Sequence, residues 1–446
     1  MMARARILVG GFGEGGTEDR VGPFGPPTSM SPSPLSRCLI LLVVMGLSSA
    51  LAADLDAANP GSASPFSFSG FGTVGGPLTA PDEATFIRDR AQPDGARGAQ
   101  PAFEVDSRLG VQIGWRPRDD LEGALQLVAR YRYDGTYRPE VTWAFAKYAL
   151  DPDTVLRVGR LGYDVYPLSD SRDVGYSYLW VRPPVDYFGQ VHYTHFDGLD
   201  LTIARALGDG VLKAKGYLGW LNETIPAPFR SEYRMRGSTL LGGYLDYQDV
   251  HWQYRVGLGT MRLAQDLPGY QALAGALRDT GDAGAIALAD ELKAAGRQFH
   301  FVTAGVAYDR GPFQSQLQVR HIDSESRAYL DNTAGYWSTG YRLGSWTPYL
   351  VASRIRSDRP ASTTGLPVGP PFAALASGVD LAFRTTQIDQ DTLSLGARFD
   401  LAHSAALKFQ IDWIESRTNP SLMWYDTEPG WNGRARVVSL VLDFVF

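Results

Sequence analysis

The segment ARVVSLVLDFVF, Ala435–Phe446, decides the fold that this sequence predicts. From Val438 onward its apolar residues occupy every second position, and Ser439 and Asp443 occupy positions of the opposite phase. Successive side chains of a strand point to opposite faces, so this period of two is typical of a β-strand with one apolar side. The segment is therefore predicted to be a strand with an apolar face and a partly polar one.

The same alternation recurs from Phe66 onward in segments of about ten residues, a pattern typical of transmembrane β-barrels. No internal apolar run reaches the roughly 18 residues that a transmembrane helix needs. The predicted strands are Phe66–Pro77, Glu104–Arg116, Glu122–Tyr133, Val141–Ala149, Thr154–Tyr163, Leu199–Leu207, Val211–Trp220, Thr239–Tyr247, Trp252–Met261, Phe299–Asp309, Phe313–Asp323, Ala334–Leu343, Thr347–Ser357, Thr392–Leu401, Leu407–Glu415 and Ala435–Phe446.

The connections between these strands are sorted by length. Every second one is tight, as at Asp151–Asp153, and the others are mostly long, as at Asp164–Gly198; Asp134–Glu140 is the one short exception. Short periplasmic turns and long outer loops are typical of outer-membrane barrels. We therefore predict an all-β fold, a 16-stranded antiparallel transmembrane barrel, whereas a soluble β-sandwich would not sort its loops in this way.

The N-terminal region predicts export. The apolar run Cys38–Leu51 follows Arg37 and leads into the small residues Ala52 and Ala53, as in a secretory signal peptide. We interpret residues 30–53 as that peptide, residues 1–29 as an over-extended gene start and residues 54–446 as the barrel. Because Cys38 is the only cysteine, a mature chain would have no disulfide and no cysteine chemistry.

The long connection contains DVYPLSDSRDVGYSYLWVRPPVDYFGQVHYTHF, Asp164–Phe196, which is too aromatic to stand free in water. Long ordered loops are usually functional, and this composition disfavours disorder. We expect the loop to fold into the barrel and narrow it; the alternative is a cap over a β-sandwich core. The connection Arg262–Gln298 is predicted to form one or two short helices, which either lid the pore mouth or cover neighbouring loops.

The strand alternation also predicts a basic interior. An arginine facing lipid near the bilayer middle costs about 2–4 kcal/mol, so these side chains cannot all point outward. Acids of the same phase are fewer, namely Asp106, Asp400, Asp412 and Asp443, which favours a hydrated lumen over a core of structural ion pairs. The predicted pore-lining cations are Arg108, Arg130, Arg132, Lys213, Lys215, Arg255, Arg320, Arg354, Arg356, Arg398 and Lys408.

Motifs of catalysis are missing: the sequence has no G-x-S-x-G, no H-E-x-x-H and no P-loop. The pair His192 and His195 lacks an obvious third ligand for a metal ion. We therefore expect neither an enzyme, nor a cofactor, nor a metal site.

The whole mature chain resembles a Gram-negative outer-membrane porin. A last strand ending in Phe446 is similar to the assembly signal of outer-membrane barrels, and the runs Phe66–Gly76 and Asp173–Gln190 resemble an uncharacterised porin-like proteobacterial group. The resemblance implies a constriction loop whose acids face a basic cluster, here Arg108, Arg130 and Arg132. Arg172, Arg182 and the aromatic loop core depart from the general pattern. The implied constriction residues are Asp164, Asp170, Asp173, Tyr176, Tyr178, Trp180, Arg182 and Asp186.

The resemblance implies a passive outer-membrane channel for small hydrophilic solutes, and the basic interior favours anionic ones. The net charge of −6 would favour cations, but a Debye length of about 8 Å gives the decision to charges near the constriction. Expected partners are outer-membrane lipid, lipopolysaccharide and the other copies of a homotrimer, with no nucleic acid. Alternatives are a channel specific for sugars or for aromatic or carboxylic acids, with Tyr176, Tyr178 and Trp180 as a stacking surface, and an enzyme or adhesin with a filled barrel.

Overall fold

The computed structural model describes residues 64–168, 171–190, 193–227, 231–357, 366–367, 369–370, 372–419, 421 and 423–446. These residues belong to one compact unit, Leu55–Phe446. The predicted gene start at 1–29 and signal peptide at 30–53 lie outside the described residues, as do Asp170 and His192.

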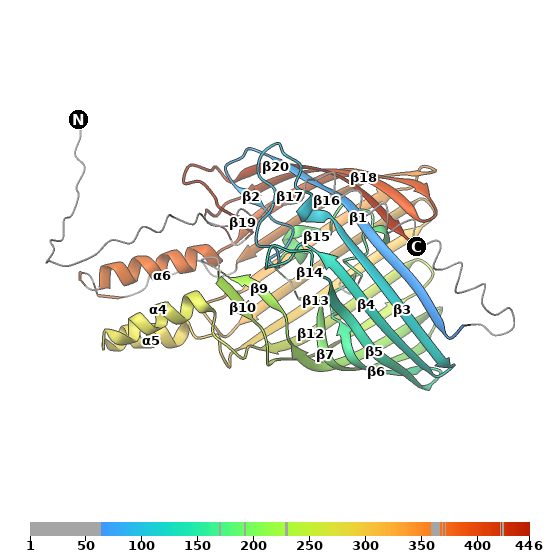
Figure 1. Cartoon of the computed structure of the whole chain (residues 1–446), viewed down its shortest axis with the longest axis horizontal. Coiled ribbons are helices and arrows are strands. Elements are labelled where there is room, and N and C mark those ends of the chain that lie inside the picture. Colours follow the sequence, from blue (N-terminus) through green and yellow to red (C-terminus); the bar gives the residue numbers. More distant parts are fainter. Residues whose placement is uncertain are drawn as a thin grey trace, which may run out of the picture. The chain divides into compact units, whose positions relative to one another are not determined.

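Sixteen antiparallel strands close into one barrel, as predicted (Figure 1). The ring closes where β1 (Phe66–Ala80) pairs with both β20 (Arg434–Val445) and β3 (Arg108–Arg118). The other wall strands are β4 (Leu121–Arg130), β5 (Glu140–Asp151), β6 (Thr154–Gly162), β7 (His195–Leu207), β8 (Gly210–Leu221), β11 (Ser238–Gln248), β12 (Trp252–Arg262), β13 (Gln298–Arg310), β14 (Phe313–Ser324), β15 (Asn332–Tyr341), β16 (Trp346–Ser357), β17 (Asp389–Ala402) and β18 (Ala405–Ser416). Two small sheets pair β9 (Thr224–Ala227) with β10 (Ser231–Arg234) and β2 (Thr85–Phe86) with β19 (Trp424–Tyr425).

Several strand ends differ from the prediction by a few residues, and two of these differences concern charged residues of the interior. Glu104 belongs to a short helix, α2 (Phe103–Asp106), because the Ser107 hydroxyl donates to the Gly75 carbonyl at 3.0 Å where the chain turns into β3. Arg132 lies beyond β4, because its amide donates to the Thr136 carbonyl at 3.0 Å and begins a turn. Asp106 therefore reaches the interior from a helix, and Arg132 reaches it from a connection.

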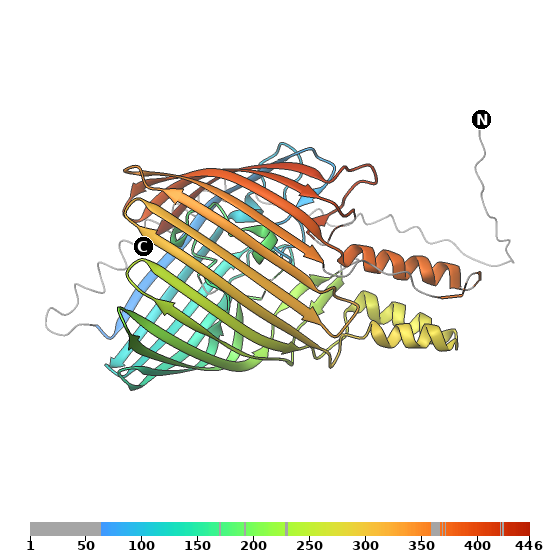
Figure 2. The same ribbon diagram turned by 180° about the vertical axis from the view of Figure 1, so that it is seen from behind.

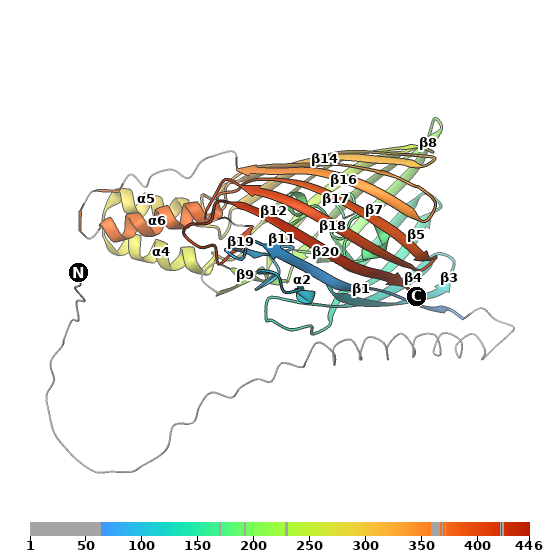
Figure 3. The ribbon, with the colours of Figure 1, turned by 90° about the horizontal axis from the view of Figure 1, so that it is seen from above.

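The lengths of the connections follow the predicted alternation. Short turns such as 152–153 and 208–209 gather at one end of the barrel, and the long connections gather at the other end. At the long-loop end lie α4 (Pro268–Asp279) and α5 (Ala283–Glu291), which confirm the predicted helices, and α6 (Phe372–Thr386), which we did not predict (Figures 2 and 3). Within the described ranges, every helix is too short or too polar to cross a membrane.

The three helices form a cap with a core of its own. Leu277 of α4, Leu288 of α5, and Val379 and Phe383 of α6 are buried together. The Tyr270 hydroxyl of α4 donates to the Ala382 carbonyl of α6 at 3.0 Å. Two loops that flank β13–β16 are thereby joined.

The wall has an apolar outer face. Leu241, Leu258, Val302 and Leu395 are each more than half exposed. Where β1 meets β20, aromatic rings at the end of β20 lie directly over glycines of β1. A Cβ on Gly72 would lie 2.3 Å from the Phe444 ring. The seam therefore requires glycine on β1.

The interior is packed as well. Its main apolar cluster joins loop residues such as Tyr166, Trp180 and Tyr187 to inward wall residues such as Tyr336 and Phe301. The loop therefore supplies the aromatic side chains around which the lumen is organised.

Candidate functional site

The connection between β6 and β7 folds into the barrel and lies against one half of its wall. It contains the short helices η1 (Gly175–Ser177) and α3 (Val185–Phe188). The Trp180 indole donates to the Ser338 hydroxyl of β15 at 2.8 Å, and the Val181 amide donates to Gln410 of β18 at 3.2 Å. The loop thus leaves the opposite half of the lumen, along β3–β8 and β11–β14, for the cavity described below.

Lys408 of β18 holds the first part of this loop. Its ammonium donates to the carbonyls of Gly175 and Tyr178 at 2.6 Å each and of Trp180 at 3.0 Å. It also pairs with Asp443 of β20 at 2.9 Å, and its side chain is completely buried. Three carbonyls and one carboxylate therefore satisfy a cation that we expected to meet water.

Arg182 holds the second part from the loop side. Its guanidinium pairs with Asp106 at 2.6 Å and with Asp412 at 3.1 Å, and it donates to the Ser439 hydroxyl at 2.6 Å. All three charged side chains are at most 5% exposed. The network joins α2, the loop, β18 and β20 in the dry interior.

Several predicted pore-lining cations instead anchor this loop to the wall. Arg320 donates to the Tyr187 carbonyl at 2.9 Å, and Arg398 donates to the Tyr176 carbonyl at 2.7 Å. Tyr178 and Trp180 are also buried. The expectation that water reaches all the inward cations was wrong for Arg108, Lys215, Arg320 and Lys408. These four are buried against acids or loop carbonyls.

Arg354 and Arg356 do not line the pore. Their neighbours Ser353 and Ile355 are buried, whereas the two arginines point out of the wall and pair with Asp391 and Asp389. They lie near the long-loop end of β16, where charges meet a polar environment. The energetic argument against outward arginines applies only near the bilayer middle.

The arginine cluster is in place, and two acids compensate most of its charge. Arg108 and Arg130 are directly paired in the β3–β4 register, and Asp173 lies 3.6 and 3.5 Å from them. Glu140 lies 2.9 Å from Arg132 and 3.9 Å from Arg130. Although burial favours its neutral form, the charges of Arg130 and Arg172 lower the pKa of Asp173. The cavity here is about 30 Å³, enough for about two or three waters.

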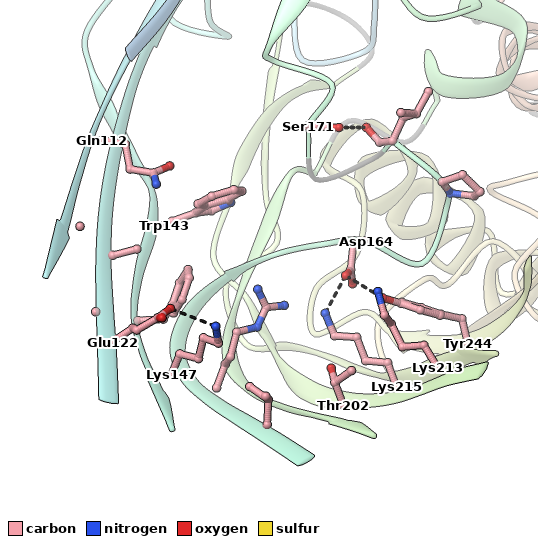
Figure 4. Close-up of a pocket in the computed structure, with 18 of the residues that line it drawn as sticks. Gln112, Glu122, Trp143, Lys147, Asp164, Ser171, Thr202, Lys213, Lys215 and Tyr244 are labelled. Carbon is pink, nitrogen blue, oxygen red and sulfur yellow. Dashed lines mark hydrogen bonds and ion pairs between the residues drawn. The ribbon is translucent and has the colours of Figure 1, made fainter. Parts of the chain in front are cut away.

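The open part of the lumen is a cavity of about 1030 Å³, which we call the vestibule (Figure 4). Asp164 accepts from Lys215 at 2.6 Å and from the Tyr244 hydroxyl at 3.3 Å, and Arg255 lies 4.2 Å over the Tyr244 ring. Glu122 pairs with Lys147 at 3.0 Å on the facing wall. The charged residues that line the vestibule are Arg116, Lys147, Arg157, Lys213, Lys215, Arg255, Glu122 and Asp164.

Three of these cations, Arg116, Lys147 and Arg157, were not predicted. Lys147 and Arg157 are cross-strand partners, and Arg157 pairs with the buried Asp200 at 2.6 Å. In β5, Lys147 lies two positions after Phe145, and both line the vestibule. The strand alternation could therefore have placed Lys147 among the inward cations.

No metal site is present in the part of the chain that the structure describes, where no three His, Cys, Asp or Glu side chains are grouped as ligands. The ring of His195 lies 3.1 Å from the Thr194 hydroxyl and 3.2 Å from the Glu223 carboxylate. His195 therefore takes part in a buried polar contact between the start of β7 and the connection that follows β8.

Solved structures of bacterial channels share this architecture. Salmonella typhi OmpF, solved in complex with daunomycin, matches with a TM-score of 0.50 and 10% identity over 85% of this chain and 97% of that one. The fold is that of a bacterial porin. OmpT of Vibrio cholerae (12% identity, TM-score 0.47, 85% and 99% covered) and the anion-selective porin from Comamonas acidovorans (12%, 0.46, 85% and 100%) are more weakly similar. No family model and no curated protein matches the chain.

Within this porin fold, we expect Asp186 to make the free energy of unfolding depend on pH. Burial raises the pKa of Asp186 to about 6, although Ser353 and Gln390 each donate to it at 2.6 Å. The stabilising contribution of the neutral carboxyl is complete below the unfolded pKa of about 3.9 and is lost as the pH rises through about 6.

We therefore expect Asp186→Asn to be more stable than the parent above pH 6, by about 2–3 kcal/mol. The difference should vanish near pH 4. Urea unfolding at pH 4, 6 and 8 measures it, and Asp209→Asn in an exposed short turn is the matched control. Equal pH profiles of Asp186→Asn and the parent would contradict the raised pKa.

Proposed function

We propose that the protein is a passive outer-membrane channel for small hydrophilic solutes, with a preference for anions. The observation that carries the anion preference is the charge of the vestibule, where six cationic side chains and two acidic ones line the cavity. Cations on the walls of a narrow, low-dielectric passage raise the local concentration of anions.

Part of that positive charge is compensated by acids that do not themselves line the cavity. Asp200 pairs with Arg157 and Lys215, and Asp246 pairs with Arg255 at 2.6 Å. Lys213 has no ion pair among the described residues, so it contributes a full charge to the vestibule. Since charges act over about 8 Å at physiological salt, Lys213 acts on solutes in the vestibule more than the acids of the outer loops do.

The rest of the proposal is supported by the wall and the loop. The apolar outer face suits the outer membrane, with its lipid and lipopolysaccharide, and a homotrimer is the assembly that we propose. The loop narrows the lumen, so solutes cross by diffusion through a constriction, without catalysis. A sugar-stacking surface is less well supported, because Tyr178 and Trp180 are buried and stack on each other, with centroids 5.9 Å apart.

Reversal potentials in a planar bilayer under a salt gradient test the selectivity. We expect the unmodified protein to prefer chloride over potassium, and Lys213→Glu to lower the anion-to-cation permeability ratio severalfold, because it replaces an unpaired vestibule cation with an acid. Lys293→Glu, an exposed residue after α5, makes the same charge change outside the lumen and should leave the ratio unchanged. Strong cation preference in the unmodified protein would refute the anion preference but not the channel.

A further inference from the structure

A second, separate cavity lies at the long-loop end of the barrel and is almost entirely apolar. Its volume is about 120 Å³, and its walls come from the β9–β10 hairpin, β12–β14, the start of α4 and the constriction loop. Its lining includes Ile225, Met235, Met261, Leu263 and Phe299, each at most 9% exposed.

A cavity of this size is unusual in the interior of a folded protein. Interiors are close-packed, with few voids larger than a water molecule. Apolar cavities stay dry, and one of about 150 Å³ lined by aliphatic and aromatic side chains binds benzene. The cavity therefore has the size and lining that suit a single aromatic ring.

One edge of the cavity is polar. Gln190 accepts a hydrogen bond from the Tyr329 hydroxyl at 2.8 Å, and the Arg90 guanidinium lies 5.4 Å over the Tyr425 ring. Arg90, Gln190 and Tyr329 all line the cavity. A ligand that places a ring among the apolar side chains can thus direct one polar group toward a cation and an amide.

We propose that this cavity is a binding site for a small monocyclic aromatic compound that carries one acidic or hydroxyl group. The ring lies between Met235, Met261 and Phe299, where the methionine sulfurs adapt to the ring and make favourable contacts with it. The polar group faces Arg90 and Gln190. This site is distinct from the vestibule, and the inference does not depend on conduction.

Tyr233 lies between the site and a second hollow. Its side chain is 3% exposed and lines both this cavity and a solvent-facing hollow of about 560 Å³ bordered by Glu232, Arg234 and Gln271. Its hydroxyl donates to the Gln265 carbonyl at 3.0 Å.

Isothermal titration of the purified full-length protein with benzoate and with phenol tests the site, with acetate as the control for the charge alone. We expect saturable binding of at least one aromatic probe and none of acetate. Ala328→Leu fills the cavity and should weaken aromatic binding by about tenfold or more, a loss of about 1.4 kcal/mol.

Ile225→Phe fills the cavity from another wall, in case Ala328→Leu does not fold; a heat-dependent shift on gels reports folding for each variant. Ala373→Leu on the exposed face of α6 is the matched control and should bind as the parent does. The proposal is overturned if neither aromatic probe saturates, if acetate binds as tightly as benzoate, or if a folded filling variant retains parental affinity.

Discussion

Deletion of Ser171–Pro184, replaced by a short Gly-Ser linker, is expected to leave a folded barrel with a single-channel conductance several times that of the parent. The wall is held by ladders of backbone hydrogen bonds that this segment does not contribute to. The segment instead occupies the lumen against β15–β18, β20 and β1, where Lys408 and Asp443 hold it. Without it, water reaches those charges and the constriction disappears.

Planar-bilayer recordings measure the conductance, and a heat-dependent gel shift reports folding. The matched control is removal of α5, which belongs to the cap beyond the barrel and should leave the conductance unchanged. If the protein without Ser171–Pro184 fails to fold, the loop is a required part of the core. An unchanged conductance would mean that the solute path does not pass this loop.

Arg182→Met is expected to destabilise the loop by about 3–5 kcal/mol, because it removes the cation that two buried acids share. Of the two acids, only Asp106 keeps a second cation among the described residues, Arg88, at 3.8 Å. Asp106 and Asp412 are 0% and 5% exposed and have Arg182 as their shared partner. Hydrogen exchange of the loop amides should show this loss directly. The conductance should also become noisier as the loop leaves the wall.

The control is Arg97→Met, which removes an ion pair of similar length, 2.8 Å, with Glu428 at the surface. Exposed pairs contribute about 0–1 kcal/mol, so this change should be nearly silent. Adding Asp106→Asn and Asp412→Asn to Arg182→Met should restore part of the stability, because the uncompensated charges are then gone. Equal effects of Arg182→Met and Arg97→Met would contradict a dry interior at this level.

The wall was predictable because its determinants are local. A period of two and the spacing of turns located all the barrel strands, and the alternation put Arg108 and Arg130 on the same inward face, where the observed register pairs them. The constriction loop could be located from its length and aromatic content. None of these steps needed to know how distant segments meet.

The interior could not be predicted, because its contacts join distant segments. Asp412 lies 230 residues from Arg182 along the chain, and the carbonyls that Lys408 binds depend on the path of the loop. Arg354 and Arg356 were assigned to the wrong face because β16 carries apolar residues on both faces. Its inward Val351 and Ile355 pack with the interior cluster that the loop completes, so apolar character did not mark the lipid side.

The cap formed by α4, α5 and α6 has a mechanical consequence. The Tyr270–Ala382 contact joins residues 112 positions apart, and the chain between them contains all of β13–β16. The helices thus link the connections before and after those four strands, at the long-loop end and outside the wall. A force that spreads β13–β16 apart from one another at that end also acts on the contact between α4 and α6, so the ladder of backbone hydrogen bonds does not oppose it alone.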